Sequence, residues 1–381
     1  MKAKSISIET FESGHFEKGF SYKYFVPNTI NAQWEWSDPD LNTLLEKASI
    51  KLGELNSFAK IVPNIDLFIQ LHVTKEAVIS SRIEGTQTNI EEALFPVEEI
   101  SPERRNDWQE VKNYIDALNN AIVELNHFPL SSRILCNAHR TLLTSVRGDH
   151  KQPGEFRNSQ NWIGGASLSD AVFIPPASHL VHQLMSDLEN FLHNSTIKVP
   201  SLIKIGIAHY QFETIHPYLD GNGRIGRLLI TLYLVSENVL TKPLLYLSTF
   251  FENNKTVYYN NLTGVRDKNN LLQWLKYFLV GIEETSAKAV ETLSSILQLK
   301  LQLELEINTK LGRRSRSGIT LLSFLFQQPI INVKDIASVC KLSNKAAYDL
   351  VDQFEKLGIL KQAGKGIRYK VFSFESYLKL F

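Results

Sequence analysis

The chain has 381 residues, of which 43% are apolar and 21% charged, with a formal net charge of +1. These are ordinary values for a globular protein of two or three domains, and they exclude a chain-wide electrostatic attraction to nucleic acid or membranes. Two cysteines without metal or redox spacing, and the absence of an apolar N-terminal or membrane-length segment, predict a cytoplasmic protein.

The first half of the chain predicts an extended arm followed by helices. Residues 1–40 are polar and aromatic with little periodicity, as in an arm laid over a folded body. Apolar residues recur at helical spacing over 40–125 and again over 130–144. Residues 147–176 are rich in Gly, Pro, Asn and Ser, and the stretch NWIGG favours a β-hairpin.

The second half begins with further helical patterns over 178–212, after 224, and from 269 onward. Residues 283–311 form one long amphipathic stretch, which is typical of a connector helix or a dimerisation helix. The basic sequence GRRSRSG that follows predicts a linker.

The last segment predicts a small domain of its own. The stretches GITLLSFLFQQ, VKDIASVCKLS and NKAAYDLVDQFEKLG predict three helices, the last two as a helix–turn–helix, and ILKQAGKGIRYKVFSF predicts a hairpin. Helix, helix, helix, hairpin is the order of a winged helix. Residues 313–381 contain 12 Lys/Arg against 5 Asp/Glu, a local excess of +7.

This excess leaves two alternatives open for the C-terminal segment. If it binds DNA, the helix from Asn344 is the recognition helix. The candidate phosphate contacts are then Lys341, Lys345, Lys365, Arg368 and Lys370. The same helix carries Asp349, Asp352 and Glu355, which repel phosphate, so the domain could instead bind protein or position the core.

Residues 216–227, HPYLDGNGRIGR, combine an acid–base group, a hard metal ligand, bare backbone and two guanidinium groups. Glycines 221 and 223 let backbone N–H groups approach an anion at a helix N-terminus. Arg224 and Arg227 lie three residues apart and share one helix face. Asp220 suits Mg²⁺, and His216 suits a general base. Together these residues predict polyphosphate binding with proton transfer.

Two other patterns overlap this stretch and are weaker. Gly221, Gly223 and Gly226 match GxGxxG, but no buried strand precedes them, as a dinucleotide fold requires. His209, Glu213 and His216 have the spacing of zinc ligands on a helix, but no second cluster completes the set. For His209 we therefore expect a hydrogen-bonded core histidine.

HPYLDGNGRIGR resembles the signature HPFxDGNGRxxR of the Fic (filamentation induced by cAMP) family. Tyr218 replaces the usual Phe, so its hydroxyl needs a partner. The stretch PNIDLFIQLHVTKEAVISSRIEGTQTNIEEAL is similar to the family's N-terminal helical region, and GEFRNSQNWIGG with FIPP is similar to its substrate-docking flap. The resemblance covers roughly residues 20–280.

The resemblance implies transfer of AMP from ATP to a hydroxyl of Tyr, Ser or Thr, with His216 as the base and Asp220 holding Mg²⁺. It also implies that Arg224 binds the β-phosphate and Arg227 the γ-phosphate. The residues implied to bind the nucleotide are Gly221, Asn222, Gly223, Arg224, Arg227 and Tyr259.

A second motif of the family, [S/T]xxxE[G/N], is matched by Ser80, Glu84 and Gly85 in SSRIEG. The resemblance implies that Glu84 pairs with Arg227 in place of the γ-phosphate and so inhibits the enzyme. Gly85 is expected to end the inhibitory helix. The alternative is an ordinary helix end whose Glu84 pairs with Arg82 or water.

We therefore expect a mainly α protein, a Fic-type helical bundle with a small β-hairpin flap plus a C-terminal winged helix. The expected parts are an N-terminal region at 1–115 with an inhibitory helix at about 70–85, a catalytic core at 116–282 with a flap at about 150–176, a connector helix at 283–312 and a winged helix-turn-helix domain at 313–381. The expected function is an autoinhibited protein adenylyltransferase using ATP and Mg²⁺. Its expected partners are a target protein hydroxyl, the chain itself as a second target, and DNA through the winged helix, but no membrane. A homodimer is also expected.

Other functions remain open for the same site. One is a deAMPylase, which removes AMP, or a transferase of another phosphate-containing group. Another is a DNA-binding regulator whose core senses a nucleotide.

Overall fold

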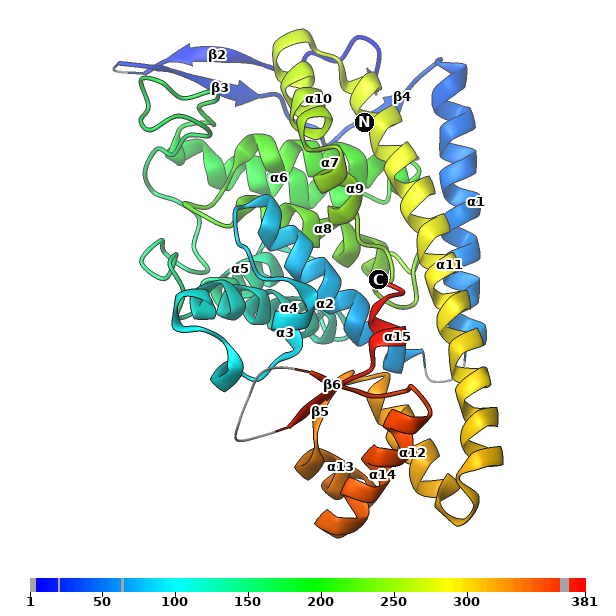
Figure 1. Ribbon diagram of the computed structural model, residues 1–381. Helices are drawn as coiled ribbons and strands as arrows, with labels where there is room; N and C mark the ends of the chain where they lie inside the picture. Colours follow the sequence, from blue (N-terminus) through cyan, green and yellow to red (C-terminus); the bar gives the residue numbers. More distant parts are fainter. Residues whose placement is uncertain (1–4, 20, 63–64, 364–369) are drawn as a thin grey trace.

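A computed structural model describes residues 5–19, 21–62, 65–363 and 370–381. Figure 1 shows a helical body with short strands at one end and a smaller unit at the other. The predicted mainly α class is confirmed. Over the described ranges, no helix combines the length and apolarity that crossing a membrane requires.

The N-terminal arm forms two small sheets. Strand β1 (Ser5–Ser7) pairs in parallel with β4 (Gln33–Glu35), and β2 (Gly14–Lys18) pairs antiparallel with β3 (Lys23–Pro27). The backbone N–H of Phe25 on β3 donates to the carbonyl of Ile174 at 2.9 Å. The predicted extended arm is therefore stranded, and it is tied to the far end of the predicted flap.

The body is built from eleven helices in the described part of the chain. These are α1 (Pro39–Ile61), α2 (Asp66–Ile83), α3 (Ile90–Leu94), α4 (Arg105–Leu125), α5 (Ser132–Leu142), α6 (Val181–His193), α7 (Ser201–Ile215), α8 (Asn222–Ser236), α9 (Ser248–Asn253), α10 (Lys255–Lys268) and α11 (Leu271–Lys310). Every residue of α7 from Leu202 to Ile215 is buried, so α7 is the central helix, packed on α6, α8 and α11. The helical pattern predicted over 178–212 is split, because α6 ends at His193 and α7 starts only after Pro200, which disfavours helix at the residue before it.

The predicted connector at 283–312 is not a separate helix. It is the second half of α11, which runs without interruption for 40 residues beside α1 (Figure 1). No proline falls within α11, so nothing in its backbone ends the helix near 283. Helix α1 covers much of the apolar stripe that suggested dimerisation, while Leu301 and Leu305 remain exposed.

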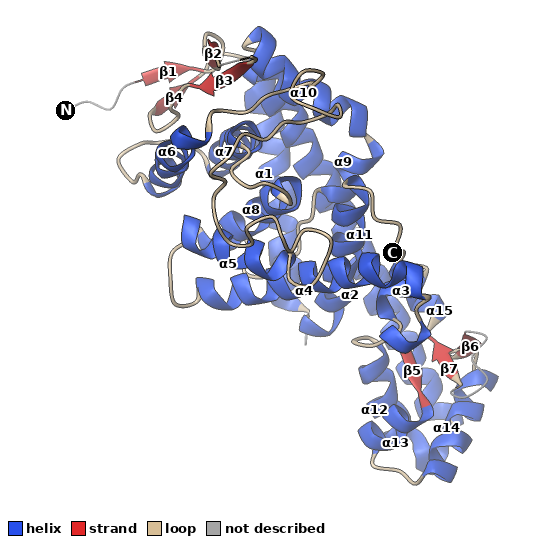
Figure 2. Cartoon of the chain, turned by 90° about the vertical axis from the view of Figure 1, so that its left-hand side faces the viewer, coloured by secondary structure: helices blue, strands red, loops and turns tan. Residues whose placement is uncertain are grey.

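Residues 315–381 form the C-terminal unit, which stands beyond the body in both views (Figures 1 and 2). Its elements are α12 (Ser315–Leu325), β5 (Ile330–Asn332), α13 (Val333–Cys340), α14 (Asn344–Lys356), β6 (Lys361–Ala363), β7 (Val371–Ser373) and α15 (Glu375–Leu378). The strand order is β5-β7-β6, with antiparallel pairs. Strand β5 was not predicted, because three residues are too few to show a period of two. Lys365 and Arg368 lie outside the described residues.

The C-terminal unit packs against α2. The rings of Phe68 and Phe326 meet edge to face with centroids 5.4 Å apart, and those of His72 and Phe381 at 4.7 Å. Phe68 and His72 both lie in the first half of α2, so the N-terminal half of this helix contacts the C-terminal unit.

Candidate functional site

The loop 216–221 joins α7 to α8, and its first residue adopts an unusual conformation. His216 is left-handed (φ 51°, ψ 61°) and is followed by Pro217, which ends α7. The guanidinium of Arg157 donates to the His216 carbonyl at 2.9 Å, and the amide of Asn161 donates to the Tyr218 carbonyl at 2.8 Å. The predicted flap segment thus holds the loop from outside.

The His216 side chain is partly buried and lies near the charges of Arg157 and Glu84. Burial lowers the pKa of His216 to about 4, and the charge of Arg157 acts in the same direction. The imidazole is therefore neutral at pH 7 and able to accept a proton from a hydroxyl.

The glycine-rich turn is partly occupied by its own side chains. The N–H of Gly221 donates to the Asp220 carboxylate at 2.6 Å. Asn222 makes reciprocal bonds of 2.8 Å with the backbone N–H and carbonyl of Tyr218. The Asn222 side chain therefore holds the loop together. The backbone N–H of Asn222 is not used in these bonds and can donate to an anion. The Asp220 side chain is 46% exposed, so an external ion can reach it.

Arg227 on α8 is buried and bound by residues of α2. Its Nε donates to Ser80 Oγ at 2.9 Å, and its Nη2 donates to the Ser80 carbonyl and to Glu84 Oε1, both at 2.8 Å. Glu84 Oε1 would be only 2.2 Å from a Cβ at Gly223, so this carboxylate lies directly on the glycine backbone. An acidic side chain thus fills the place expected for a phosphate.

This pair is electrostatically strong on both sides. Burial opposes charge on Glu84, but Arg227 still lowers the pKa of the Glu84 carboxyl. Burial likewise opposes charge on Arg227, while Glu84 raises the pKa of the guanidinium overall. Both groups are therefore charged at neutral pH.

Glu84 lies at the very end of α2. Gly85 is left-handed (φ 106°), its N–H donates to the Arg82 carbonyl at 2.9 Å, and the N–H of Thr86 donates to the Ser81 carbonyl at 3.2 Å. This is a Schellman motif, so the predicted helix end at Gly85 is confirmed. The side chain of Glu84 is about one-third exposed (34%).

Arg224 has a carboxylate partner that sequence reasoning missed. Its Nη1 lies 3.1 Å from Glu110 Oε2, and its Nη2 lies 3.7 Å from Asp220 Oδ1. Glu110 also binds Arg147 at 3.0 Å, and its side chain is only 8% exposed. The available signal was an acidic residue on the apolar face of the helix predicted from WQEVKNYIDAL.

His139 on α5 was also missed. The N–H of Gly154 donates to His139 Nδ1 at 2.8 Å, so Nε2 carries the proton that is shared with the Asp220 carbonyl at 3.0 Å. The His139 ring stacks on Tyr218 at 3.8 Å, and the Tyr218 hydroxyl meets Cys136 Sγ at 3.6 Å. The expected partner of this hydroxyl is therefore a weak acceptor.

Of the residues in the GxGxxG match and in the zinc-like spacing, His209 and Gly226 have structural roles in the core. His209 binds the Gly226 carbonyl and the Tyr258 hydroxyl, each at 2.9 Å, which confirms it as a hydrogen-bonded core histidine. Gly226 lies inside α8, where a Cβ would be 2.1 Å from Glu213 Oε1. Burial raises the pKa of Glu213 to about 7. No group of three or more potential metal ligands occurs among the residues described.

Tyr259 on α10 is 39% exposed, with its ring 5.1 Å from that of Tyr258. Burial raises the pKa of Tyr259 to about 12, and the charge of Glu84 adds to the shift. Tyr259 is thus a neighbour of the Glu84–Arg227 pair.

Comparison with known proteins agrees with this arrangement. Residues 42–123 match the Fic/DOC family N-terminal model, and residues 129–234 match the Fic/DOC family model. Over 119 residues the chain is 29% identical to protein adenylyltransferase fic-1 of Caenorhabditis briggsae, and over 89 residues it is 38% identical to a probable protein adenylyltransferase of Aquifex aeolicus. These matches cover 31% and 23% of this chain. They cover 22% and 26% of the relatives, so the chain spans about a quarter or less of their length.

The fold has a solved counterpart in a Fic family protein from Desulfovibrio desulfuricans G20. The two share a TM-score of 0.55 at 18% identity, over 88% of this chain and 96% of that one. Residues 216–227 lie inside the segment that matches the Fic/DOC family model. Glu84 lies inside the segment that matches the N-terminal model. The chain is a Fic domain protein.

Proposed function

We propose that the chain is a protein adenylyltransferase that moves AMP from ATP to a hydroxyl of a target protein or of itself. Attack of the hydroxyl oxygen on the α-phosphorus breaks the bond to the β-phosphate, so diphosphate leaves. The names of the curated relatives support this activity.

The polar groups around the loop each have a proposed role in catalysis or nucleotide binding. His216, neutral at pH 7, removes the proton of the attacking hydroxyl. Backbone N–H groups of Asn222 and Gly223 donate to phosphate oxygens at the start of α8, and that of Gly221 joins them when it leaves the Asp220 carboxylate. The guanidinium groups of Arg224 and Arg227 neutralise the β- and γ-phosphates, and Tyr259 borders the nucleoside.

Mg²⁺ fits beside Asp220. A magnesium ion usually takes one or two protein carboxylates and completes its shell with phosphates and water. Asp220 offers one half-exposed carboxylate at the mouth of the loop, and it lies 3.7 Å from Arg224. Mg²⁺ bound there would neutralise charge on the phosphates.

The proposed enzyme is held inactive by Ser80 and Glu84, and the observation that carries this is Glu84 lying on both Arg227 and Gly223. The γ-phosphate of a productively bound ATP needs the same guanidinium. ATP must therefore displace a charge-assisted contact or bind in a pose that does not react.

The test compares wild type, Glu84→Gly and His216→Ala with Mg²⁺ and α-phosphate-labelled ATP. We expect strong label on Glu84→Gly, weak label on wild type, and at least ~100-fold less label when His216→Ala is added to Glu84→Gly. Intact mass must show added AMP. Equal labelling of wild type and Glu84→Gly would contradict the brake.

The same experiment separates the two alternatives. Release of AMP from pre-labelled protein by wild type, but not by Glu84→Gly, would indicate a deAMPylase. Nucleotide binding without label in any folded variant would indicate a sensor.

DNA binding by the C-terminal unit is a separate proposal. The region around the start of α14 exposes Lys341, Lys345 and Tyr348, as a recognition helix for DNA requires. Lys370 is also exposed, just before β7. Arg314 pairs with Asp349 at 3.1 Å, which removes one of the repelling acidic charges. Filter binding at two salt concentrations tests this proposal, and binding that is absent or insensitive to salt would favour a protein partner.

A further inference from the structure

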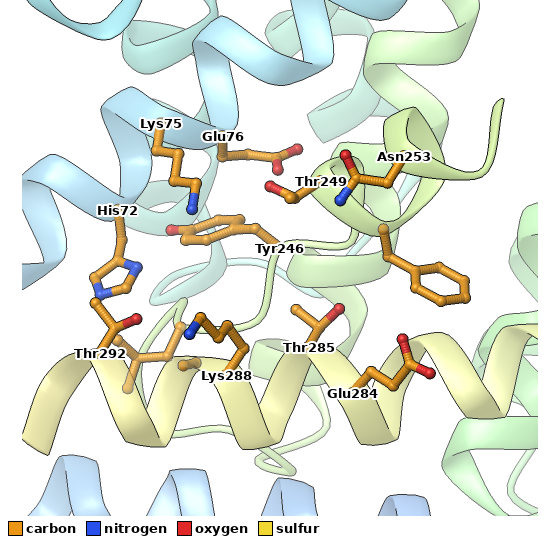
Figure 3. Close-up of a pocket in the computed structure, with 13 residues that line it drawn as sticks. His72, Lys75, Glu76, Tyr246, Thr249, Asn253, Glu284, Thr285, Lys288 and Thr292 are labelled. Atoms are coloured by element: carbon orange, nitrogen blue, oxygen red, sulfur yellow. The ribbon is translucent and has the colours of Figure 1, made fainter. Parts of the chain in front are cut away.

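A cavity of about 350 Å³ lies between α2, α9 and α11 (Figure 3). No residue of the loop 216–227 lines it. Lys75 and Glu76 enter it from α2, Lys288 enters from α11, and Tyr246 enters from the segment before α9. The cavity therefore joins the helix that ends at Glu84 to the long helix of the body.

Three buried polar atoms of its lining have no hydrogen-bond partner within the described residues. They are Glu76 Oε2, the Tyr246 hydroxyl and His72 Nε2. Glu76 and Tyr246 are only 4% and 9% exposed. Glu76 Oε1, in contrast, accepts bonds from Tyr114 at 3.0 Å and Ser248 at 2.5 Å. Since buried polar groups normally find partners, their concentration at one cavity indicates a polar ligand.

The cavity also brings two lysines together. Burial lowers the pKa of Lys75, and the charge of Lys288 lowers it further, so the two ammonium groups repel each other. Lys75 forms no ion pair with any residue of the described ranges. Lys288 pairs with Glu291 at 3.1 Å, but both side chains are about 70% exposed (74% and 69%), so that pair is weak. An anion between the two lysines would relieve their repulsion.

We propose that this cavity binds a small organic anion, whose phosphate or carboxylate group lies between Lys75 and Lys288 and whose hydroxyl groups reach Glu76. Sugar phosphates and hydroxylated di- or tricarboxylates share this chemistry. The Tyr246 hydroxyl donates to the anionic group, and Asn253 on the far side of Glu76 contacts the ligand's polar end (Figure 3).

The bound anion stabilises α2 in the position that places Glu84 on Arg227. Glu76, Ser80 and Glu84 follow one another at intervals of four along one face of α2. A ligand held by Lys75 and Lys288 links this helix to α11, so it favours the conformation in which both lysines line the cavity. This effector role rests on the proposed function, whereas the binding site does not.

The binding test uses pyridoxal 5′-phosphate, whose phosphate seeks cationic sites and whose aldehyde condenses with a lysine amine. Borohydride reduces the imine, and peptide mass spectrometry locates it. We expect Lys75 to be labelled before the exposed Lys47 of α1, with protection by ribose 5-phosphate or by citrate but not by ATP. Equal labelling of Lys75 and Lys47, or protection by neither anion, overturns the site. The anion that protects distinguishes a phosphate site from a carboxylate site.

Matched variants on α11 locate the anion. Lys288→Met should abolish protection of Lys75, whereas Lys300→Met, which breaks a partly buried pair with Glu304 outside the cavity, should leave it intact. Protection that survives Lys288→Met places the anion elsewhere and overturns the proposal.

The effector role is tested by self-AMPylation with and without the protecting anion. We expect at least ~5-fold slower labelling of wild type and no change in Glu84→Gly. Protection of Lys75 with an unchanged wild-type rate overturns the effector role. Absence of AMPylation in every variant overturns the proposed function, while the labelling result on Lys75 still decides the site.

Discussion

Two arginines on the first turns of α8 each meet a carboxylate from the N-terminal region, but the two carboxylates are built differently. Glu84 is at the end of α2, before a left-handed glycine, and is about one-third exposed (34%). Glu110 is inside α4, 8% exposed, and shared between Arg224 and Arg147. A contact at a helix end can open without unfolding its helix, whereas one in a helix interior cannot. The first pair is thus suited to regulation and the second to support.

The largest expected difference between the pairs is in stability. Glu110→Ala leaves Arg224, which is 4% exposed, without its main partner, and we expect a loss of about 3–5 kcal/mol in the free energy of unfolding. Glu84→Gly should cost less, about 1–3 kcal/mol, because Arg227, although only 2% exposed, keeps two bonds to Ser80, and water can reach the place of the one-third exposed Glu84. Urea unfolding of both variants measures this. Similar losses would remove the distinction between support and regulation.

The next difference is in catalysis, and here the two carboxylates should act with opposite sign. In a Glu84→Gly background, we expect Glu110→Gln to raise the KM for ATP about tenfold, because Arg224 is no longer held toward the phosphates. Glutamine retains the size of Glu110, so packing is preserved. Initial rates of labelling at several ATP concentrations give KM and kcat separately. A lower KM would instead make Glu110 a second inhibitory group.

The pH profile gives a smaller effect, and it reports on Glu84, the one carboxylate of the two pairs whose charge acts on His216. Burial, together with the charges of Arg157 and Arg266, lowers the pKa of His216 to about 4, although Glu84 acts in the opposite direction. A base with a lowered pKa stays deprotonated as the pH falls, until the pH approaches that pKa. For Glu84→Gly we therefore expect kcat/KM to change less than twofold between pH 7 and about pH 5.5. A base with the ordinary pKa of ~6.5 would lose about tenfold over the same interval.

The sequence was sufficient to predict the positions of residues whose structure depends on near neighbours in the chain. The spacing within 216–227 placed Arg224 and Arg227 on one turn, and the glycine after Glu84 predicted the helix end. Glu110 and His139 could not be predicted as site residues, because their roles depend on helices α4 and α5 crossing the loop in three dimensions. The same holds for the unbroken α11, since the pattern of a long amphipathic helix does not say where a domain ends.

The smallest expected effect comes from Tyr218→Phe, which provides a baseline for both pairs. Tyr218 contacts neither arginine side chain. Its ring stacks on His139, and within the described part of the chain its hydroxyl donates to the Cys136 sulfur alone, at 3.6 Å. Phenylalanine preserves the stacking and removes a poorly satisfied buried hydroxyl, so the free energy of unfolding should change by less than about 1 kcal/mol. Labelling by Glu84→Gly should change less than about twofold when Tyr218→Phe is added. A larger loss in labelling than in stability would show that the hydroxyl shapes the loop, and the differences assigned to Glu84 and Glu110 would then have to be measured relative to the loop as a whole.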